Sequence, residues 1–365
     1  MSLTVAGQDR AAAITHRRVD LTMVDEAGKA GIEPDVSVVI PTLNAAGVLE
    51  PCLESIRGQE YSGALEIVIA DGGSTDGTLA IAEKFDCIVV GNPLKTGEAG
   101  KAAGLKAATG DVIALIDSDN ILPDERWMAR MTAPFSDPAI AGCEPIEYTL
   151  RPGDPSLTRY CALIGMNDPL VYFLGNYDRM SVLSGTWTGL PIEARDRGDY
   201  LEVRLEADAV PTMGANGFMV RRELVELLGI EDYLFDIDVV SRLVGLGHDR
   251  FAKVKTGIVH LYGKGLRTFA RKQLRRVRDY SYYSSQGMRS YGWSGQKRRG
   301  IARFIVYCLL VVPLGAQALE GYRRKPDSAW LLHVPACWIT LVVYGWGFIE
   351  ARVRPREQRR EKWKQ

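Results

Sequence analysis

Two aspartates separated by one residue, Asp117 and Asp119, directly follow the apolar segment 113–116. If that segment is a strand, alternation places both carboxylates on the same side of an extended backbone. Neighbouring carboxylates repel each other unless a cation or several hydrogen-bond donors lie between them. A hard divalent cation that takes its remaining ligands from phosphate oxygens suits such a pair. The pair is equally compatible with a polar turn after a strand, so its surroundings have to decide.

The sequence around this pair alternates between strand and helix patterns. Strands are expected over residues 36–40, 65–70, 87–90 and 112–116. Helices are expected around residues 49–56, after residue 78 and around residues 101–108. This alternation predicts βαβ units and a parallel sheet. Such sheets bind ligands beyond the carboxyl ends of their strands, where the turns at Pro41, Asp71 and Asp117 would lie. A site for a nucleoside diphosphate is therefore expected at this edge.

Other phosphate-binding motifs do not fit the chain. A P-loop needs glycine five residues before its final Gly-Lys pair and serine or threonine after it. For the pair Gly100-Lys101 in the glycine-rich segment 97–104, these two places are occupied by Lys95 and Ala102. No G-x-G-x-x-G follows the first expected strand, which argues against a nicotinamide-binding domain.

Three motifs together carry a family resemblance. They are V-S-V-V-I-P-T-L-N at 36–44, I-V-I-A-D-G-G-S-T-D-G-T at 67–78 and A-A-T-G-D-V-I-A-L-I-D-S-D-N at 107–120. With a later acidic segment, they make residues 35–280 resemble the family 2 glycosyltransferases, which have the GT-A fold. The resemblance implies a Rossmann-like, mostly parallel sheet and inverting transfer of a sugar from a UDP- or GDP-linked donor, with Mg²⁺ or Mn²⁺ as cofactor.

The resemblance also implies roles for individual residues of the donor site. Asp119, Asp117 and His260 match positions near the metal and the diphosphate. Ala102 departs from the family, in which an asparagine commonly follows the basic residue. The residues implied in donor binding are Pro41, Thr42, Asn44, Asp71, Gly73, Lys101, Asp117 and Ser118.

A second group of residues would carry the transfer itself. Asp236 aligns with the family's catalytic base, and Phe235 replaces the usual glutamate before it. A base is needed because a neutral hydroxyl attacks an anomeric carbon poorly. Asp238 is the alternative base, and both aspartates would also suit a helix N-terminus.

The acceptor side is marked by two further segments. Gly214, Ala215 and Asn216 belong to a glycine-rich stretch that permits close backbone approach to a ligand. Gln273 and Arg276 match the Q-x-x-R-W motif of processive members, but Val277 stands in place of the tryptophan. That substitution argues against a synthase of long polymers.

Beyond the transferase-like region the chain becomes basic and then apolar. Residues 264–303 hold twelve Lys or Arg against one acid, with tyrosines interleaved. Because apolar segments follow at 304–319 and 329–349, we interpret the basic segment as contacting anionic membrane lipid rather than nucleic acid. The second apolar segment is long enough to span a bilayer. Basic flanks predict that both ends of this helical hairpin face the cytoplasm.

Composition agrees with this organisation. The chain has 365 residues and no net charge, and its six cysteines lack any C-x-x-C spacing, as expected for reduced thiols in the cytoplasm. No apolar core of a signal peptide occurs in the first 33 residues. The predicted parts are an N-terminal extension (1–33), an α/β GT-A domain (34–263), basic amphipathic interface helices (264–300), a membrane hairpin (301–350) and a basic cytoplasmic tail (351–365).

The sequence thus predicts a metal-dependent, inverting hexosyltransferase-type enzyme at the cytoplasmic membrane, with its catalytic domain facing the cytoplasm. Its expected partners are a nucleotide-sugar, anionic lipid and a lipid-linked acceptor, either a polyprenyl phosphate or a lipid-linked glycan. Two alternatives remain open. One is transfer to a soluble or polysaccharide acceptor, and the other is a non-catalytic GT-A scaffold.

Overall fold

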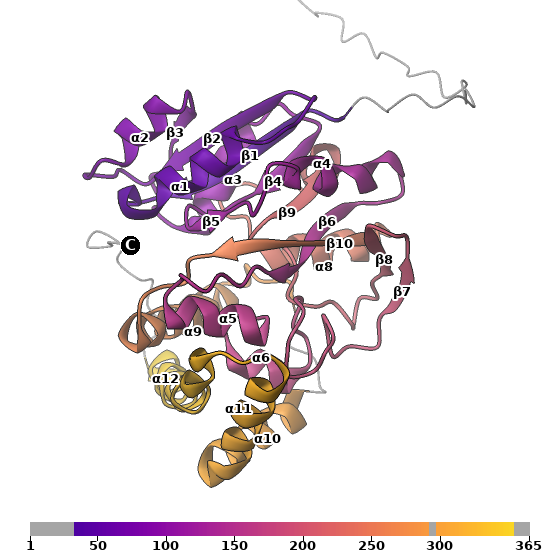
Figure 1. Ribbon diagram of the computed structural model, residues 1–365. Coiled ribbons are helices and arrows are strands. Elements are labelled where there is room, and N and C mark those ends of the chain that lie inside the picture. The colour runs from indigo at the N-terminus through magenta and orange to yellow at the C-terminus, as the bar shows by residue number, and fades with distance from the viewer. Residues whose placement is uncertain (1–32, 292–296, 354–365) are drawn as a thin grey trace, which may run out of the picture. The chain divides into compact units, whose positions relative to one another are not determined.

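The computed structural model describes residues 33–291 and 297–353. A mixed β-sheet forms its centre (Figure 1). Among these residues ten strands form one sheet in the order β3-β2-β1-β4-β9-β6-β10-β8-β7, and β5 pairs with β10. The strands are β1 (Val36–Thr42), β2 (Leu65–Asp71), β3 (Ile88–Gly91), β4 (Val112–Leu115), β5 (Asn120–Ile121), β6 (Gly142–Tyr148), β7 (Glu193–Asp196), β8 (Tyr200–Arg204), β9 (Phe218–Arg221) and β10 (Arg250–His260).

The expected parallel arrangement is confirmed for the first four strands. β1 pairs in parallel with β2 and β4, and β2 pairs in parallel with β3. The sheet becomes mixed at β9, which runs antiparallel to both β4 and β6. β9 therefore joins the first half of the sheet to the second, which places the glycine-rich segment just before it beside the end of β4.

Helices cover both faces of the parallel half. Val38 and Ile40 of β1 pack into one apolar cluster with Leu49 of α1, whereas Val39 packs into another with Ala102 of α3. This alternation follows from the period of two in a strand that is buried on both faces. The helices are α1 (Ala46–Arg57), α2 (Thr78–Lys84), α3 (Gly97–Ala107), α4 (Trp127–Thr132), α5 (Ser156–Ile164), α6 (Pro169–Leu174), α7 (Arg222–Leu227), α8 (Asp236–Gly245), α9 (Leu266–Ser285), α10 (Lys297–Leu310), α11 (Val312–Arg324) and α12 (His333–Val353), with 3₁₀ helices η1 (Ala133–Ser136) and η2 (Ser328–Leu332).

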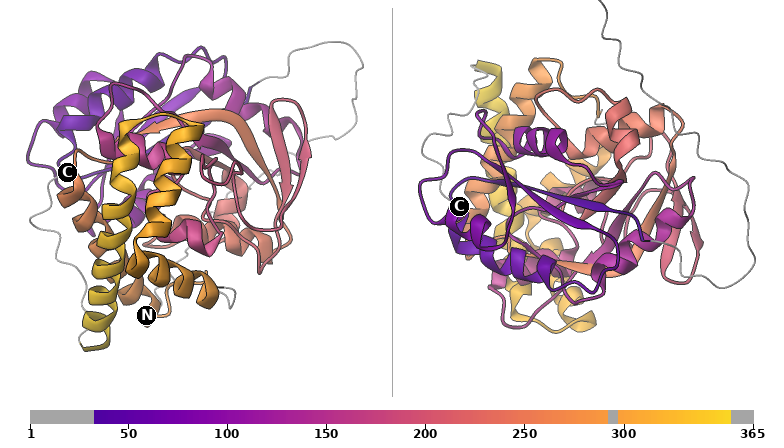
Figure 2. Two further views of the ribbon diagram at one scale, coloured as in Figure 1. Left: turned by 60° about the horizontal axis from the view of Figure 1, so that its bottom comes forward. Right: turned by 90° about the horizontal axis from the view of Figure 1, so that it is seen from above.

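The C-terminal helices pack on the same unit as the sheet. They gather with α5, α6 and α9 on the side of β10 away from β1–β4 (Figures 1 and 2). α9 contacts α12 along its length, and α10 contacts α6. The chain from Ile32 onward forms one contact unit, and the domain boundaries expected within it stay predictions.

The two apolar segments differ in shape. Residues 328–353 form one helix that is long and apolar enough to cross a membrane. The segment 304–319, expected as the first arm of the hairpin, is divided between α10 and α11, which meet at 95°. Val311 at the junction has a φ of 61°, and Pro313 lies in the first turn of α11, where its missing backbone donor is tolerated. Only taken together, as a span that is broken in the middle, are α10 and α11 long and apolar enough to be a second membrane-crossing segment.

Several predicted segments lie outside the described residues. These are residues 1–32 of the N-terminal extension, residues 292–296 of the basic and aromatic segment, and residues 354–365 of the basic tail. Their predicted roles stay predictions.

Helix α12 is held against α9 by close contact at a glycine. A Cβ atom added to Gly347 would collide with the side chain of Val277, whereas one added to Gly345 would meet no atom within 4 Å. Gly347→Leu should therefore lower the free energy of unfolding by about 1–3 kcal/mol through overpacking. Thermal unfolding of the detergent-purified protein measures this. Gly345→Leu is the matched control, since it gains the same helix propensity without the collision. Equal melting temperatures for both variants would contradict the packing.

Candidate active site

Lys101 joins the two halves of the candidate site. It lies on α3 with 5% of its surface exposed, and its Nζ is 2.8 Å from Oδ2 of Asp236 and 3.4 Å from Oδ1 of Asp117. Burial alone would lower the pKa of Lys101, but the charges of the two aspartates outweigh burial and raise it above its ordinary value. The lysine therefore stays charged and holds together carboxylates that would otherwise repel each other.

Asp236 has the electrostatic character of a proton acceptor. Burial raises its pKa to about 6, and the negative charge of Asp117 adds to this rise against the opposing effect of Lys101. The side chain keeps 21% of its surface exposed at the first residue of α8. A carboxylate that is more basic than usual and remains accessible suits general base catalysis.

Asp238, the alternative base, has a different environment. Its Oδ2 accepts a hydrogen bond from Arg289 Nε at 2.6 Å, and its Oδ1 accepts bonds from the backbone N–H groups of Ser290 and Tyr291. With 5% of its surface exposed, it holds the segment after α9 against α8. Asp238 therefore has a structural role, and Asp236 is the more accessible of the two carboxylates.

Phe235 replaces the family's glutamate and belongs to the same contact with α9. Its ring stacks on Tyr233 with centroids 6.0 Å apart, and it packs against Tyr283 of α9. The guanidinium of Arg289 lies 4.7 Å from its ring centroid. The substitution thus exchanges an acidic side chain for an aromatic anchor, while the neighbouring Asp236 keeps its place.

The glycine-rich stretch before β9 supports this arrangement. Gly214 has a φ of 126°, and a Cβ there would collide with the backbone of Asp236, so only glycine permits this approach. Asn216 is buried and accepts a hydrogen bond from Asn120 Nδ2 at 3.1 Å. Ala215 contributes its carbonyl, which accepts from Arg179. Through these contacts the three residues fix the chain before β9 against Asp236, Asn120 and Arg179.

The two aspartates after β4 do not share one extended face as expected. β4 ends at Leu115, and the turn that follows is closed by Asn120, whose backbone N–H bonds to the Asp117 carbonyl. Asp117 faces Lys101, while Asp119 faces Nε2 of His260 at 3.5 Å and Nζ of Lys272 at 3.4 Å. The turn thus directs each carboxylate toward a different cation.

Asp119 and His260 fit a divalent cation that brings most of its own ligands. Burial would raise the pKa of Asp119, but His260 and Lys272 hold it well below its usual range, so the group is ionised. His260 Nδ1 is buried without a partner in the described part of the chain. The described residues contain no set of three or more His, Cys, Asp or Glu placed to hold a metal. One or two protein ligands suffice where phosphate oxygens and water complete the coordination, as is usual for Mg²⁺.

The remaining residues that the sequence predicts to bind the donor lie in hydrogen-bonded turns at the ends of β1 and β2. Asp71 accepts hydrogen bonds from Thr42 Oγ1, from Ser74 Oγ and from the backbone N–H groups of Gly73 and Ser74. Asn44, with a φ of 52°, bonds through its Oδ1 to the N–H of Thr75. Because the Asp71 carboxylate already fills its usual acceptor capacity, its first role is to fix the turn. The other predicted donor residues lie nearby: Pro41 ends β1 with Thr42, and Ser118 is buried between the two aspartates.

Gln273 and Arg276 lie at a junction between helices. Gln273 Nε2 donates to the Asn167 carbonyl at 2.7 Å, and its Oε1 accepts from Arg276 at 2.7 Å and from the Tyr344 hydroxyl at 3.0 Å. Tyr344 also donates to Asp168, which caps α6. These two predicted acceptor residues therefore join α9 to α6 and α12.

Sequence reasoning missed a buried ionic cluster beneath the glycine-rich stretch. Glu144 is fully buried between Arg179 Nη1 and Lys253 Nζ, each at 2.6 Å, and accepts the N–H of Gly214. Burial would raise the pKa of Glu144, but the two cations lower it. Each member lies alone in its own segment of sequence, so no spacing signals the cluster. Lys272 was also missed, although it precedes the recognised Gln273.

Comparison with known proteins settles the class. The family model for glycosyl transferase family 2 matches residues 37–226, which is more than half of the chain. The chain belongs to glycosyl transferase family 2. This agrees with the α/β fold and with the site at the carboxyl ends of β1, β2 and β4.

Curated relatives match only parts of the chain. Glycosyltransferase AglE of Haloferax volcanii is 28% identical over 142 residues, covering 36% of this chain and 46% of AglE. The pre-mycofactocin glycosyltransferase of Mycobacterium tuberculosis is 32% identical over 133 residues, covering 35% of this chain and 27% of the relative. The chain therefore spans less than half the length of these relatives.

A solved structure gives a longer but weaker match. The mannosyltransferase PcManGT from Pyrobaculum calidifontis, in complex with GDP-Man and Mn²⁺, is 17% identical with a TM-score of 0.49. The match covers 86% of this chain and 88% of that protein.

The two aspartates of α8 should respond differently to substitution. Asp238→Ala leaves the charge of Arg289 and two backbone N–H groups without their buried partner, which should lower the free energy of unfolding by about 3 kcal/mol. Chemical denaturation in detergent measures this. Asp232→Ala, at an exposed position before the same helix, is the control and should change stability by no more than about 0.5 kcal/mol. Stability of Asp238→Ala close to wild type would overturn its structural role.

Proposed function

We propose that this protein is an inverting glycosyltransferase that transfers a sugar from a UDP- or GDP-linked donor to a lipid-linked acceptor at the cytoplasmic face of a membrane. The observation that carries the proposal is the junction of Lys101 with Asp117 and Asp236, in a chain whose C-terminal helices also expose large apolar side chains. The junction supports donor binding and proton removal in one place, and the helices support an acceptor held in a bilayer.

The donor would bind along the carboxyl ends of β1, β2 and β4. Pro41, Thr42, Asn44, Asp71 and Gly73 form the edge that we assign to the nucleoside. Asp117 and Ser118 continue this edge toward the diphosphate, and Lys101 stands beside them with a positive charge. Such a row of turns at strand ends is where α/β sheets bind nucleotides.

A divalent cation, Mg²⁺ or Mn²⁺, would be held by Asp119, with Asp117 and His260 beside it, and would offset the negative charge that develops on the leaving diphosphate. Lys272 lies 3.4 Å from Asp119 and brings a second positive charge to the same place. Its Nζ lies over the ring of Tyr262, 4.5 Å from the ring centroid. The lysine therefore approaches the diphosphate position from α9.

The acceptor hydroxyl would lose its proton to Asp236 as it attacks the anomeric carbon. A single carboxylate that removes the proton, with the leaving group on the opposite side, gives direct displacement and inversion. Lys101 keeps this carboxylate in place through its bond to both oxygens. A phosphate acceptor such as a polyprenyl phosphate is already a nucleophile and needs no base, so the two acceptor classes differ in their dependence on Asp236.

The membrane part of the proposal rests on surface composition. Most large hydrophobic side chains that are exposed in the described residues belong to α10, α11 and α12. They include Ile305, Leu309, Val312, Val342, Trp346 and Ile349. Exposed apolar side chains concentrated on helices that contact one another are typical of contact with lipid or with another protein. The neighbouring helix α9, with its five arginines and one lysine, supports the choice of lipid, because anionic membranes attract such helices.

The acceptor class can be tested with two substitutions. Asp119→Ala should lower sugar transfer from a radiolabelled nucleotide-sugar at least about 100-fold, since charge on the leaving group is no longer offset. Asp236→Asn should lower it by about 10²–10⁴-fold if the acceptor is a hydroxyl. Near-normal transfer by Asp236→Asn, with loss in Asp119→Ala, would instead favour a phosphate acceptor.

Activity of the wild type should also disappear with a chelator and return with Mn²⁺ or Mg²⁺. Transfer that survives both Asp119→Ala and chelation would refute the proposed donor site.

Membrane residence can be tested on the full-length protein. The protein should remain in the membrane fraction in 1 M salt and be released by detergent, because salt screens the attraction between basic residues and lipid but not the burial of apolar helices. Sedimentation of washed membranes measures this. Release by salt alone would mean that α10–α12 are not embedded.

A further inference from the structure

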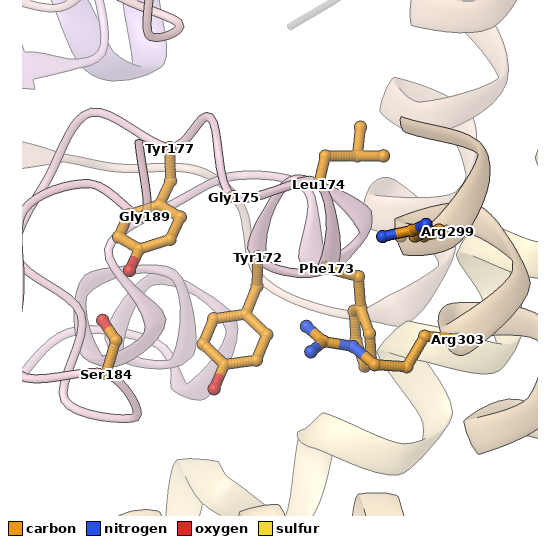
Figure 3. A pocket seen from close by; sticks show the side chains of 10 residues that line it. Tyr172, Phe173, Leu174, Gly175, Tyr177, Ser184, Gly189, Arg299 and Arg303 are labelled. Atoms are coloured by element: carbon orange, nitrogen blue, oxygen red, sulfur yellow. The ribbon is translucent and has the colours of Figure 1, made fainter. Parts of the chain in front are cut away.

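A second pocket lies away from the candidate active site, between α6 and α10 (Figure 3). It has a volume of about 390 Å³, and no residue of the donor or base site lines it. Tyr172, Phe173 and Tyr177 form its aromatic wall. Tyr172 and Tyr177 lie across from Arg299 and Arg303, and Phe173 lies beside Arg303 (Figure 3). Neither the donor nor the base chemistry accounts for this pocket.

The pocket carries positive charge without an acid to balance it. Arg299 and Arg303 are four residues apart on α10, so they lie on the same face of the helix. No aspartate or glutamate lines the pocket, and within the described part of the chain neither arginine forms an ion pair. Figure 3 shows the Arg303 guanidinium turned toward Tyr172, with Phe173 beside it. Two arginines on one wall of a pocket are typical of phosphate recognition.

The aromatic wall is held in place by its own contacts. Tyr172 and Tyr177 stack with centroids 6.1 Å apart, and the Tyr177 hydroxyl lies 2.8 Å from Thr186 Oγ1. Phe173 packs edge-on against Phe304 of α10, and the Arg303 guanidinium lies 5.2 Å from its ring centroid. These contacts fix the wall relative to α10 before any ligand arrives, which reduces the entropy lost on binding.

The same helix continues from the pocket into exposed apolar surface. Ile301, Ile305 and Val306 of α10 are exposed, and Leu309 and Leu310 follow. A ligand with an anionic head in the pocket would therefore have apolar protein surface along which its chains can lie. Basic pockets beside membrane helices are known sites for lipid headgroups.

We infer that this pocket binds the phosphate headgroup of an anionic membrane lipid, with Arg299 and Arg303 contacting the phosphate and the aromatic wall contacting the glycerol and upper acyl chain. The inference rests on the proposed membrane residence of the protein but not on its transferase activity. The site is separate from that of the sugar donor, so the lipid bound there would anchor the protein rather than react.

The test uses the full-length protein in a neutral detergent and dihexanoyl phosphatidic acid as the probe, with binding measured by isothermal titration calorimetry. The double variant Arg299→Gln/Arg303→Gln should bind this lipid at least about tenfold more weakly than the wild type. The control Arg298→Gln/Arg323→Gln removes the same charge from exposed positions that do not line the pocket. It should bind like the wild type. Dihexanoyl phosphatidylcholine should not bind measurably to the wild type or to either double variant.

Three results would overturn the inference. Equal weakening in the control variant would mean that overall charge, and not the pocket, attracts the lipid. Unchanged binding in the pocket variant would exclude both arginines. Displacement of the lipid by millimolar inorganic phosphate would identify a site for free phosphate. Asp119→Ala should keep full lipid binding, so failure of the donor site and failure of this pocket are distinguished in one set of samples.

Discussion

The buried charge of Lys101 is the constraint on which the site depends. An ammonium group with so little exposure is stable only with opposite charge beside it, since an unpaired buried ion costs several kcal/mol. Its two partners come from a turn after β4 and from the start of α8, 119 residues later in the chain. Folding therefore has to bring these segments together, and the pairing that satisfies the lysine also brings the proposed donor edge next to the proposed base.

The rest of the fold serves this junction through close backbone packing. Gly214 lets the chain before β9 touch the backbone of Asp236. Glu144, which is paired with Arg179 and Lys253, holds that chain in place by accepting the backbone N–H of Gly214. Removing one member of such a cluster would leave a buried charge unpaired, so the cluster specifies one arrangement of the loop. α9 then adds Lys272 near Asp119 and, through the segment that follows it, Arg289 beside Asp238. The basic helix is thus part of the site and also part of the surface that we propose to face the membrane.

The sequence was sufficient where a local pattern and a local structure coincide. Strands β1, β2 and β4 and helices α1–α3 follow from alternating and 3.6-period apolar residues, and the family motifs marked Lys101, Asp117 and Asp236. Distant contacts were not readable in this way. The family alignment already favoured Asp236 over Asp238 as the base, but the contact that occupies Asp238 comes from Arg289, 51 residues further along the chain. The Glu144 cluster joins three segments without any shared spacing. The bend at Val311 could not be predicted either. A positive φ is unfavourable for valine, so this backbone conformation follows from the packing of α10 and α11 and not from the residue's own preference.

The central claim is direct displacement, with Asp236 on one side of the anomeric carbon and the nucleoside diphosphate on the other. The most direct measurement is the anomeric configuration of the product, determined by NMR after transfer from a nucleotide-sugar whose anomeric linkage is α. A β-linked product is the result predicted by a single displacement at this site. An α-linked product would require a second displacement or a different geometry, and it would contradict the assignment of Asp236 and Lys101.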